Sequence, residues 1–348
     1  MTKRAIILFN LGGPDNQRAV RPFLFNLFND PAIIALPSLA RWVLAQLISR
    51  LRLRKARAIF ARIGGKSPLL ELTQAQARTL EARLNAERAG GADYRVFIAM
   101  RYWHPLTDET VEEVKAYAPD HVVLLPLYPQ FSTTTTASSL AAWNEAWFWR
   151  GTDVPVTSVC CYPDAPGLIA AHAALLKTEL AKAREHGPVR VLFSAHGLPT
   201  KVIAGGDPYD WQVSRTATAL AHAVGLTQKD WAICYQSRVG LLEWIGPPIE
   251  EELKRAADDG LGVIVLPIAF VSEHSETLVE LDMDYRARAA EMGIKFYARV
   301  PALGTHPSFI DELAELALEA FDHDGTLMSE AGTRLCPGRC TACPHKGS

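Results

Sequence analysis

The sequence lacks an uninterrupted apolar run long enough to cross a bilayer, although 49% of its 348 residues are hydrophobic. A spanning helix needs about 20 consecutive apolar residues. The apolar run nearest the N-terminus, Ala5 to Leu11, is short and ends in Gly12-Gly13-Pro14, which indicates a first strand and not a signal peptide. We therefore expect a soluble or peripheral cytoplasmic protein with enough residues for two domains.

An excess of charge of one sign is also absent, because 36 basic residues nearly balance 38 acidic ones. The formal net charge of -2 supplies no basic field for nucleic acid, and no helix-turn-helix or zinc-finger spacing replaces one. Cysteine is sparse as well, since six cysteines are too few for a disulfide scaffold in a chain of this length. Three of them, Cys336, Cys340 and Cys343, crowd the end of the chain, which indicates a metal site.

Seven short runs rich in Val, Ile and Leu recur along the chain, with helical patterns between them. They show no strict polar alternation, which is typical of parallel strands covered by helices on both faces. The pattern predicts an α/β fold with two similar halves of about four strands each. The runs are Ala5 to Leu11, Arg95 to Met100, His121 to Pro126, Val154 to Cys161, Val189 to Ser194, Asp230 to Tyr235 and Gly262 to Ala269.

Polar residues follow most of these runs, and ligands of open parallel sheets bind beyond the carboxyl ends of the strands. In the segment FSAHGLP, His196 follows a predicted buried strand directly. A neutral imidazole there can accept a proton or bind a cation. A structural hydrogen-bonding role for His196 is an equal alternative.

Glu273, Glu276, Glu280 and Asp284 follow another strand at spacings of three, four and four. On an α-helix they would form one carboxylate stripe. Such a stripe is ordinarily a solvated helix face, but this one begins at a strand end with His274 and Glu276 at its head. Carboxylates and imidazole suit ferrous iron, so the stripe is a candidate path for iron and for displaced protons.

Residues 30–63 do not follow the alternation of predicted strands and helices. An apolar stretch from Ala32 to Ile48 precedes a basic cluster. One interpretation is a helix resting on a membrane surface, and the other is a helical hairpin packed on the core. The basic residues are Arg50, Arg52, Arg54, Lys55 and Arg57.

Nine strings along the chain carry a family resemblance. They are ILFNLGGP, IGGKSPL, MRYWHPLT, YPQFSTTTTASS, FSAHGLP, GDPYDWQV, YQSRVG, EWIGPP and PIAFVSEHSETLVELD, in this order. In these strings, and over nearly its whole length, the sequence resembles the ferrochelatases, which insert ferrous iron into a porphyrin to make haem. The resemblance implies two Rossmann-like domains, 1–171 (with the lip 30–63) and 172–305, with a porphyrin cleft between them. A helix over 306–321 would return to the first domain, and 322–348 would form a cysteine-bearing tail.

By motif match, the resemblance implies that His196 and Glu276 form the iron site and accept protons, with His274 and Glu280 in support. Either Arg50 or Arg54 could take the role that the match gives to Arg52, because no rigid motif anchors that helix. The implied porphyrin contacts are Leu11, Arg52, Ser67, Arg101, Tyr102 and Tyr128 in the first half, and Tyr209 and Trp244 in the second. A plain core position is the alternative for Trp244.

The tail cysteines have the spacing C-x3-C-x2-C, which favours metal ligation. Cluster-bearing ferrochelatases resemble this chain in holding a 2Fe–2S cluster with three C-terminal cysteines and one internal cysteine. Thr133 stands where the animal enzymes have the internal one, so Cys160 and Cys161 are the candidates for the fourth ligand. Neighbours on a strand point to opposite faces, so only one should ligate, and we favour Cys161. A zinc site on the same thiolates is the competing interpretation.

The function expected from the resemblance is insertion of ferrous iron into protoporphyrin IX to form protohaem. The long apolar segment favours this apolar substrate over coproporphyrin III, which is the alternative within the family. A non-catalytic tetrapyrrole or haem carrier is the alternative of another class. We also expect peripheral contact with the inner face of the membrane, and a homodimer on base rates.

Overall fold

The computed structural model describes residues 2–87, 91–149, 151, 153–238, 240, 242–323 and 326–345. The chain divides into two compact units, neither of which is one continuous stretch. The first unit consists of Met1–Cys161, Leu313–Leu335 and Pro344–Ser348, and the second consists of Tyr162–Glu312 and Cys336–Cys343.

The first unit is built on a five-stranded parallel sheet with the order β2-β1-β3-β4-β9. In the interior strand β1 (Lys3–Asn10), every side chain from Ala5 to Phe9 is buried. This is the pattern of a strand covered on both faces, and it explains why the strand was readable from a continuous apolar run. The strands are β1 (Lys3–Asn10), β2 (Asp93–Met100), β3 (His121–Pro126), β4 (Val156–Val159) and β9 (Leu327–Met328).

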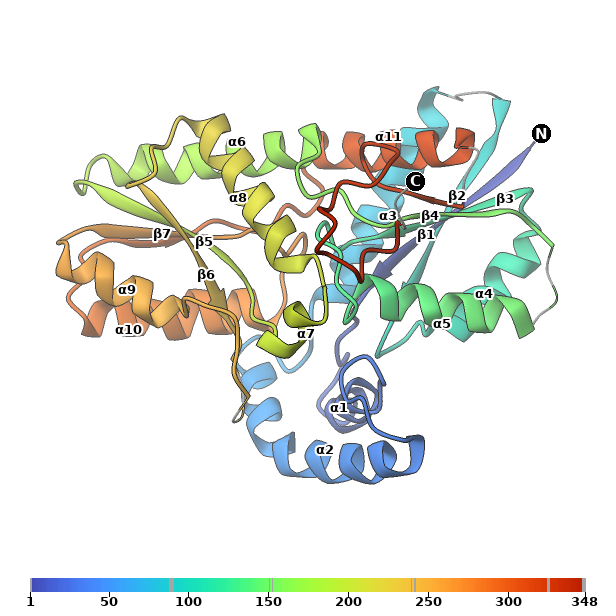
Figure 1. Cartoon of the computed structure of the whole chain (residues 1–348), viewed down its shortest axis with the longest axis horizontal. Helices are drawn as coiled ribbons and strands as arrows, with labels where there is room; N and C mark the ends of the chain where they lie inside the picture. The colour runs from blue at the N-terminus through green and yellow to red at the C-terminus, as the bar shows by residue number, and fades with distance from the viewer. Residues whose placement is uncertain are drawn as a thin grey trace. The chain divides into compact units, whose positions relative to one another are not determined.

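Helices α3 (Leu69–Glu87), α4 (Thr107–Tyr117) and α5 (Thr136–Trp149) pack on this sheet (Figure 1), and Phe321 near the C-terminus contacts Tyr94 and His121 of its strands. Helices α4 and α5 cover one face through an apolar cluster that includes Val111 and Trp143. Helix α3 lies beside β2, where Asn85 Nδ2 donates to the Tyr94 carbonyl at 2.8 Å.

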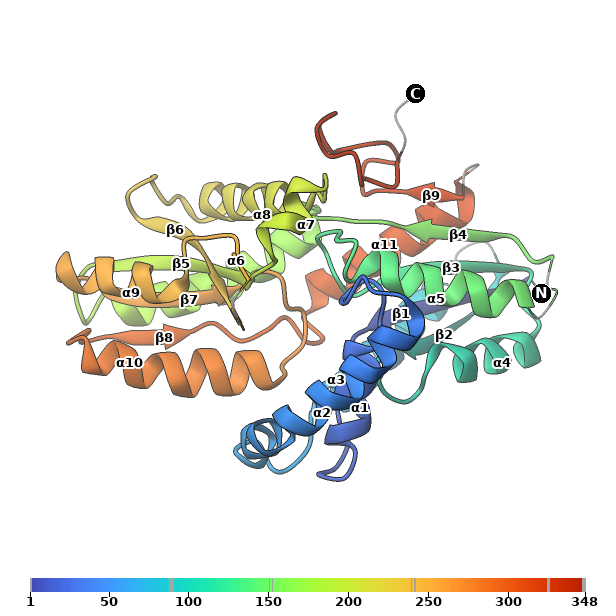
Figure 2. The same ribbon diagram turned by 60° about the horizontal axis from the view of Figure 1, so that its bottom comes forward.

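Helices α1 (Val20–Phe28) and α2 (Ser38–Ala61) form a pair that projects from the sheet of the first unit (Figures 1 and 2). Val20 and Phe60 belong to the small apolar cluster that holds the pair together. The opposite side of α2 keeps a row of large apolar side chains in water. These exposed residues are Leu39, Val43, Leu47 and Leu51. Trp42 is half-exposed, and its ring system packs edge-to-face against Phe25 of α1.

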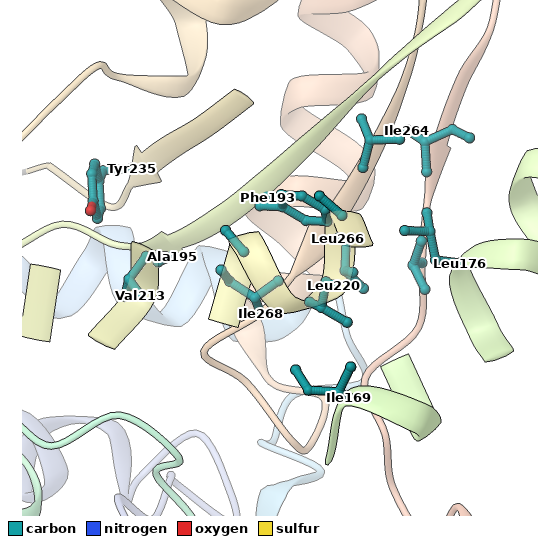
Figure 3. Close-up of a cluster of buried hydrophobic side chains, with 14 of the residues drawn as sticks. Ile169, Leu176, Phe193, Ala195, Val213, Leu220, Tyr235, Ile264, Leu266 and Ile268 are labelled. Atoms are coloured by element: carbon teal, nitrogen blue, oxygen red, sulfur yellow. The ribbon is translucent and has the colours of Figure 1, made fainter. Parts of the chain in front are cut away.

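The second unit contains a four-stranded parallel sheet with the order β6-β5-β7-β8. Helices α6 and α8 lie on one side of it, and α9, η2 and α10 lie on the other (Figure 1). Figure 3 shows the core on the first side, where Leu176 and Leu220 from the two helices meet Phe193 and Leu266 from the strands. The elements are α6 (Pro166–Ala183), β5 (Val189–His196), α7 (Thr200–Ala204), α8 (Tyr209–Val224), β6 (Trp231–Gln236), α9 (Ile249–Asp258), β7 (Gly262–Pro267), η2 (Glu276–Asp284), α10 (Tyr285–Glu291) and β8 (Tyr297–Arg299). The last helix, α11 (Pro307–Asp322), contributes residues to both units.

The two-sheet α/β architecture is confirmed, and each predicted strand run overlaps an observed strand. Strands β8 and β9 were not predicted, because three and two residues are too few to show a pattern. In the part of the chain that the structure describes, no helix combines the length and the hydropathy that a membrane crossing requires.

Candidate functional site

His196 and Glu276 meet at the carboxyl end of the second sheet. His196 is the last residue of β5, and Glu276 is the first residue of η2. Nε2 of His196 lies 3.7 Å from Oε1 of Glu276, and each side chain is about one-third exposed, at 36% and 35%. The structure therefore brings together, within reach of water, the two residues that the motif match singled out.

The tautomer of His196 follows from its other ring nitrogen. Nδ1 lies 2.6 Å from the Gly197 carbonyl oxygen, and a carbonyl oxygen only accepts hydrogen bonds. Nδ1 therefore carries the proton, and the Nε2 of a neutral ring presents its lone pair toward Glu276. Two acceptors that face each other at 3.7 Å leave a position between them for a proton or a cation.

His274 orients Glu276 through the backbone. The Glu276 amide donates to His274 Nδ1 at 2.9 Å, which places the His274 proton on Nε2. Burial lowers the pKa of His274, while the charge of Glu276 acts in the opposite direction. His274 is thus a neutral ring that supports the start of η2.

Glu280 is fixed by donors from the neighbouring strand end. Its Oε1 accepts from the Ser237 amide at 2.8 Å, and its Oε2 accepts from the Ser237 hydroxyl at 2.5 Å. The fully buried Gln236 connects three elements, since its Oε1 accepts from Ser194 at 2.8 Å and its Nε2 donates to the Glu276 carbonyl at 3.3 Å. Sequence reasoning missed Gln236 and Ser237, although the string YQSRVG placed them at a strand end.

The expected stripe of four carboxylates is wrong. Glu273 lies before η2, where Arg299 Nη1 binds it at 2.8 Å, and Asp284 is exposed at the far end. The segment Glu276–Asp284 is a π-helix, so the α-helical spacing assumed from the sequence does not apply to it. Only Glu276 and Glu280 of the four belong to the site.

Two aromatic residues border His196. Burial raises the pKa of the Tyr209 hydroxyl, and the negative charge of Glu276 raises it further, so Tyr209 stays protonated. The ring of Trp244 covers Gly197, since a Cβ built on that glycine would lie 3.3 Å from the ring. Both predicted residues thus lie next to the histidine and shape its surroundings.

The predicted porphyrin contacts of the first half lie in the first unit. The carbonyl of Leu11 accepts from the Tyr102 amide at 2.9 Å, and the buried Ser67 packs directly on Gly13. Burial raises the pKa of the Tyr128 hydroxyl. Arg52 lies on α2, where its guanidinium stacks 5.5 Å above the ring of Phe28.

Arg101 is held by two side chains. Its Nε donates to the Ser138 hydroxyl at 2.7 Å, and its Nη2 pairs with Asp30 Oδ2 at 2.9 Å. Its side chain is 22% exposed, and the contacts to Ser138 and Asp30 occupy its Nε and Nη2. Neither Ser138 nor Asp30 was singled out from the sequence.

The three tail cysteines gather in one place. Cys336, Cys340 and Cys343 are all buried and pack together against Trp211, and Gln212 Nε2 donates to the Cys336 sulfur at 3.2 Å. Thiolates are the ligand type that zinc and iron–sulfur groups prefer. Nevertheless, no three His, Cys, Asp or Glu side chains among the described residues stand in an arrangement that would hold a metal ion.

Cys160 and Cys161 belong to the first unit. The prediction that they point to opposite faces is wrong, because β4 ends at Val159 and the rule for strands no longer holds beyond it. Their sulfurs lie 3.3 Å apart in one buried cluster with Phe131.

A family model described as Ferrochelatase matches residues 3–321. The chain belongs to the ferrochelatase family. It is 55% identical over 349 residues to a ferrochelatase of Phenylobacterium zucineum, with 99% of each chain covered. It is 49% identical over 345 residues to a ferrochelatase of Hyphomonas neptunium, with 98% of this chain and 94% of the relative covered.

Solved structures agree on the fold. The sirohydrochlorin chelatase SirB of Bacillus subtilis subspecies spizizenii, in complex with cobalt, aligns with a TM-score of 0.52 at 10% identity. The alignment covers 93% of this chain and 97% of SirB. As a ferrochelatase, the protein is a metal chelatase of haem biosynthesis with ferrous iron as a substrate, and this confirms the expected enzyme class.

Proposed function

We propose that His196 and Glu276 carry out the insertion of ferrous iron into protoporphyrin IX. The observation that supports this proposal is that His196 Nε2 and Glu276 Oε1, two hydrogen-bond acceptors, face each other at 3.7 Å at a strand end. Insertion requires two pyrrole N–H protons to leave as the ring nitrogens bind iron. The Nε2 lone pair of His196 takes one of these protons, and the Glu276 carboxylate takes the other.

Glu280 and His274 assist this step. Glu280 lies one π-helical turn beyond Glu276 and is fixed by two donors from Ser237. It is placed to accept a proton passed on by Glu276. His274 stays neutral and fixes the backbone at Glu276, so it orients the carboxylate and does not titrate with it.

The first unit contributes porphyrin-binding groups. A carboxyl side group of the ring would pair with the partly exposed side chain of Arg101, since a guanidinium binds carboxylates with matched geometry. Within the first unit, Leu11, Ser67, Tyr128 and Arg52 are further candidate porphyrin contacts. Within the second unit, the candidates are Tyr209 and Trp244, near His196. Tyr102 is buried with its hydroxyl bound to Asp30, so it acts through packing.

The exposed apolar row of α2 supports a preference for protoporphyrin and a peripheral membrane contact. Leu39 and Leu51, at its two ends, are 76% and 74% exposed. Arg50, Arg54, Lys55 and Arg57 follow on the same helix, and each basic residue near an anionic surface adds about 1 kcal/mol of attraction. An apolar face followed by cations fits the inner face of a cytoplasmic membrane.

Vesicle sedimentation tests this contact. Leu39→Ser with Leu47→Ser should reduce binding to phosphatidylcholine/phosphatidylserine vesicles about tenfold or more, because two large apolar side chains are lost from the interface. Met292→Ser, an exposed apolar residue of the second unit, is the matched control and should bind as the wild type does. Equal vesicle binding by the wild type, the double variant and the control would contradict the proposed membrane contact.

The buried tail thiols support a 2Fe–2S cluster that would be held by Cys336, Cys340 and Cys343. When bound, the cluster would supply a redox-active group, and no step of iron insertion depends on it. A reducible brown chromophore lost in Cys340→Ser would support the assignment. Colourless protein with stoichiometric zinc would favour the competing zinc site.

An insertion assay tests the proposed roles of His196 and Glu276. His196→Ala and Glu276→Gln should each lower kcat about 100-fold or more while porphyrin still binds, because proton transfer is lost. His222→Ala and Glu291→Gln change exposed residues of the same unit and serve as matched controls. Unchanged insertion by His196→Ala would show that this histidine is structural. Turnover of coproporphyrin III equal to or better than that of protoporphyrin IX would reverse the substrate preference.

A further inference from the structure

Asp30 is a buried carboxylate that no motif brought to attention. It follows α1 at the start of the turn that leads to α2, and only 3% of it is exposed. Burying a carboxylate is costly unless donors replace the lost water. Here four donors do so, and they come from three separate parts of the first unit.

The two oxygens of Asp30 divide these donors. Oδ2 accepts from the Tyr102 hydroxyl at 2.8 Å, from Ser138 Oγ at 2.5 Å and from Arg101 Nη2 at 2.9 Å. Oδ1 accepts from the Ala32 amide at 2.8 Å. One oxygen therefore holds the arginine, and the other holds the turn before α2.

These contacts fix the guanidinium of Arg101 in one orientation. Asp30 binds Nη2 and Ser138 binds Nε, so the plane of the group is set by two anchors. Nη1 has no hydrogen bond to any residue that the structure describes. Asp30 thus leaves a charged, oriented edge for an anionic ligand group, and orientation before binding lowers the entropic cost of binding.

The same residue controls the turn that carries exposed apolar side chains. The Asp30 carbonyl accepts from the amides of Ile33 and Ile34 at 3.1 and 2.9 Å. Arg41 closes the far end of the turn, with Nε donating to the Asn29 carbonyl at 2.8 Å. Movement of this turn would displace the carboxylate that anchors Arg101.

We infer that Asp30 is a positioning residue that aligns Arg101 for a carboxylate of the porphyrin substrate. The inference rests on the proposed function, in which Arg101 contacts such a group. It assigns to Asp30 control of affinity for carboxyl-bearing rings, not of the chemical step. Asp30 touches neither the reacting nitrogens nor the iron.

The experiment compares a dicarboxylic porphyrin with its dimethyl ester in the same detergent. Asp30→Asn should raise KM for the acid about tenfold, with kcat within twofold of the wild type and KM for the ester unchanged. In an Arg101→Ala background the same substitution should add less than twofold, because Asp30 acts through Arg101. Asp322→Asn, which removes an exposed carboxylate that pairs with Arg4 in the first unit, is the matched control and should change neither constant.

Ser138→Ala keeps the test usable if Asp30→Asn folds poorly. It removes the bond to Arg101 Nε and one donor to Asp30, so KM for the acid should rise about threefold and KM for the ester should not change. An equal rise for acid and ester in either variant would overturn the inference. A wild-type KM for the acid in Arg101→Ala would instead refute the proposed role of Arg101.

Discussion

His172 should make the protein markedly less stable in mild acid. It lies on α6 with no exposed surface, and neither ring nitrogen has a hydrogen-bond partner among the described residues. Burial, with a smaller contribution from the nearby His306, lowers the pKa of His172 to about 3. In the unfolded chain the pKa returns to about 6.5, so the unfolded state binds an extra proton between these two values.

The size of the effect follows from this difference. The free energy of unfolding is unaffected by protonation of His172 above pH 6.5, where the ring is neutral in both states. It falls as the pH drops from 6.5 toward 3, by about 5 kcal/mol in all. Between pH 7.5 and 4.5 the expected loss in the free energy of unfolding is about 3 kcal/mol. The folded protein therefore weakens well before its carboxylates titrate.

His172→Leu isolates this contribution. Leucine has no titratable group and leaves no unsatisfied nitrogen, so the variant should be at least as stable as the wild type at pH 7.5. Urea unfolding at several pH values between 7.5 and 4.5 measures the difference in the free energy of unfolding, which should reach about 3 kcal/mol in favour of the variant. His222→Leu, at an exposed position, should follow the wild-type profile. Parallel profiles for wild type and His172→Leu would refute the reasoning.

Three further predictions concern the two units. Gly13→Ala should lower the free energy of unfolding by about 1–3 kcal/mol, because the added Cβ would lie 2.5 Å from Ser67. Gly338→Ala is the control, since its Cβ would meet no atom within 4 Å, and thermal unfolding compares the two variants. Arg299→Met should cost about 1–3 kcal/mol in urea unfolding, since it removes the guanidinium that pairs with the partly buried Glu273 and Asp282. An unchanged free energy of unfolding would contradict this. Ser237→Ala should lower kcat for iron insertion about tenfold by loosening Glu280, while Ser214→Ala, whose hydroxyl bonds only to its own helix, should not; equal rates would exclude the anchoring role.

The sequence predicted well what depends on local patterns. Strands such as β1 and β7 were readable because both faces are buried and the apolar run is continuous. The placement of His196 and Glu276 near each other was implied by motif resemblance, and the structure places them together. The π-helix was missed because a spacing of three and four fits an α-helix equally well on paper.

Residues whose roles depend on distant partners were not predictable in this way. Asp30 meets Tyr102 and Ser138 across 72 and 108 positions of sequence, and nothing near Asp30 in the chain indicates either partner. Gln236 is similar, since its amide connects two strands and a helix. The prediction that the Cys160 and Cys161 thiols point to opposite faces failed because both residues follow the end of β4, where the alternation of a strand no longer holds.

Strand β9 has a consequence for how the protein is made. It pairs with β4 at the edge of the first sheet, yet it lies among the last residues of the chain. Translation of the roughly 170 residues between the two strands takes on the order of 10 to 30 s, and during that time β4 has an unpaired edge. The N-terminal half therefore leaves the ribosome with its sheet incomplete, and a nascent chain halted before Leu327 would expose a strand edge to which other chains can add.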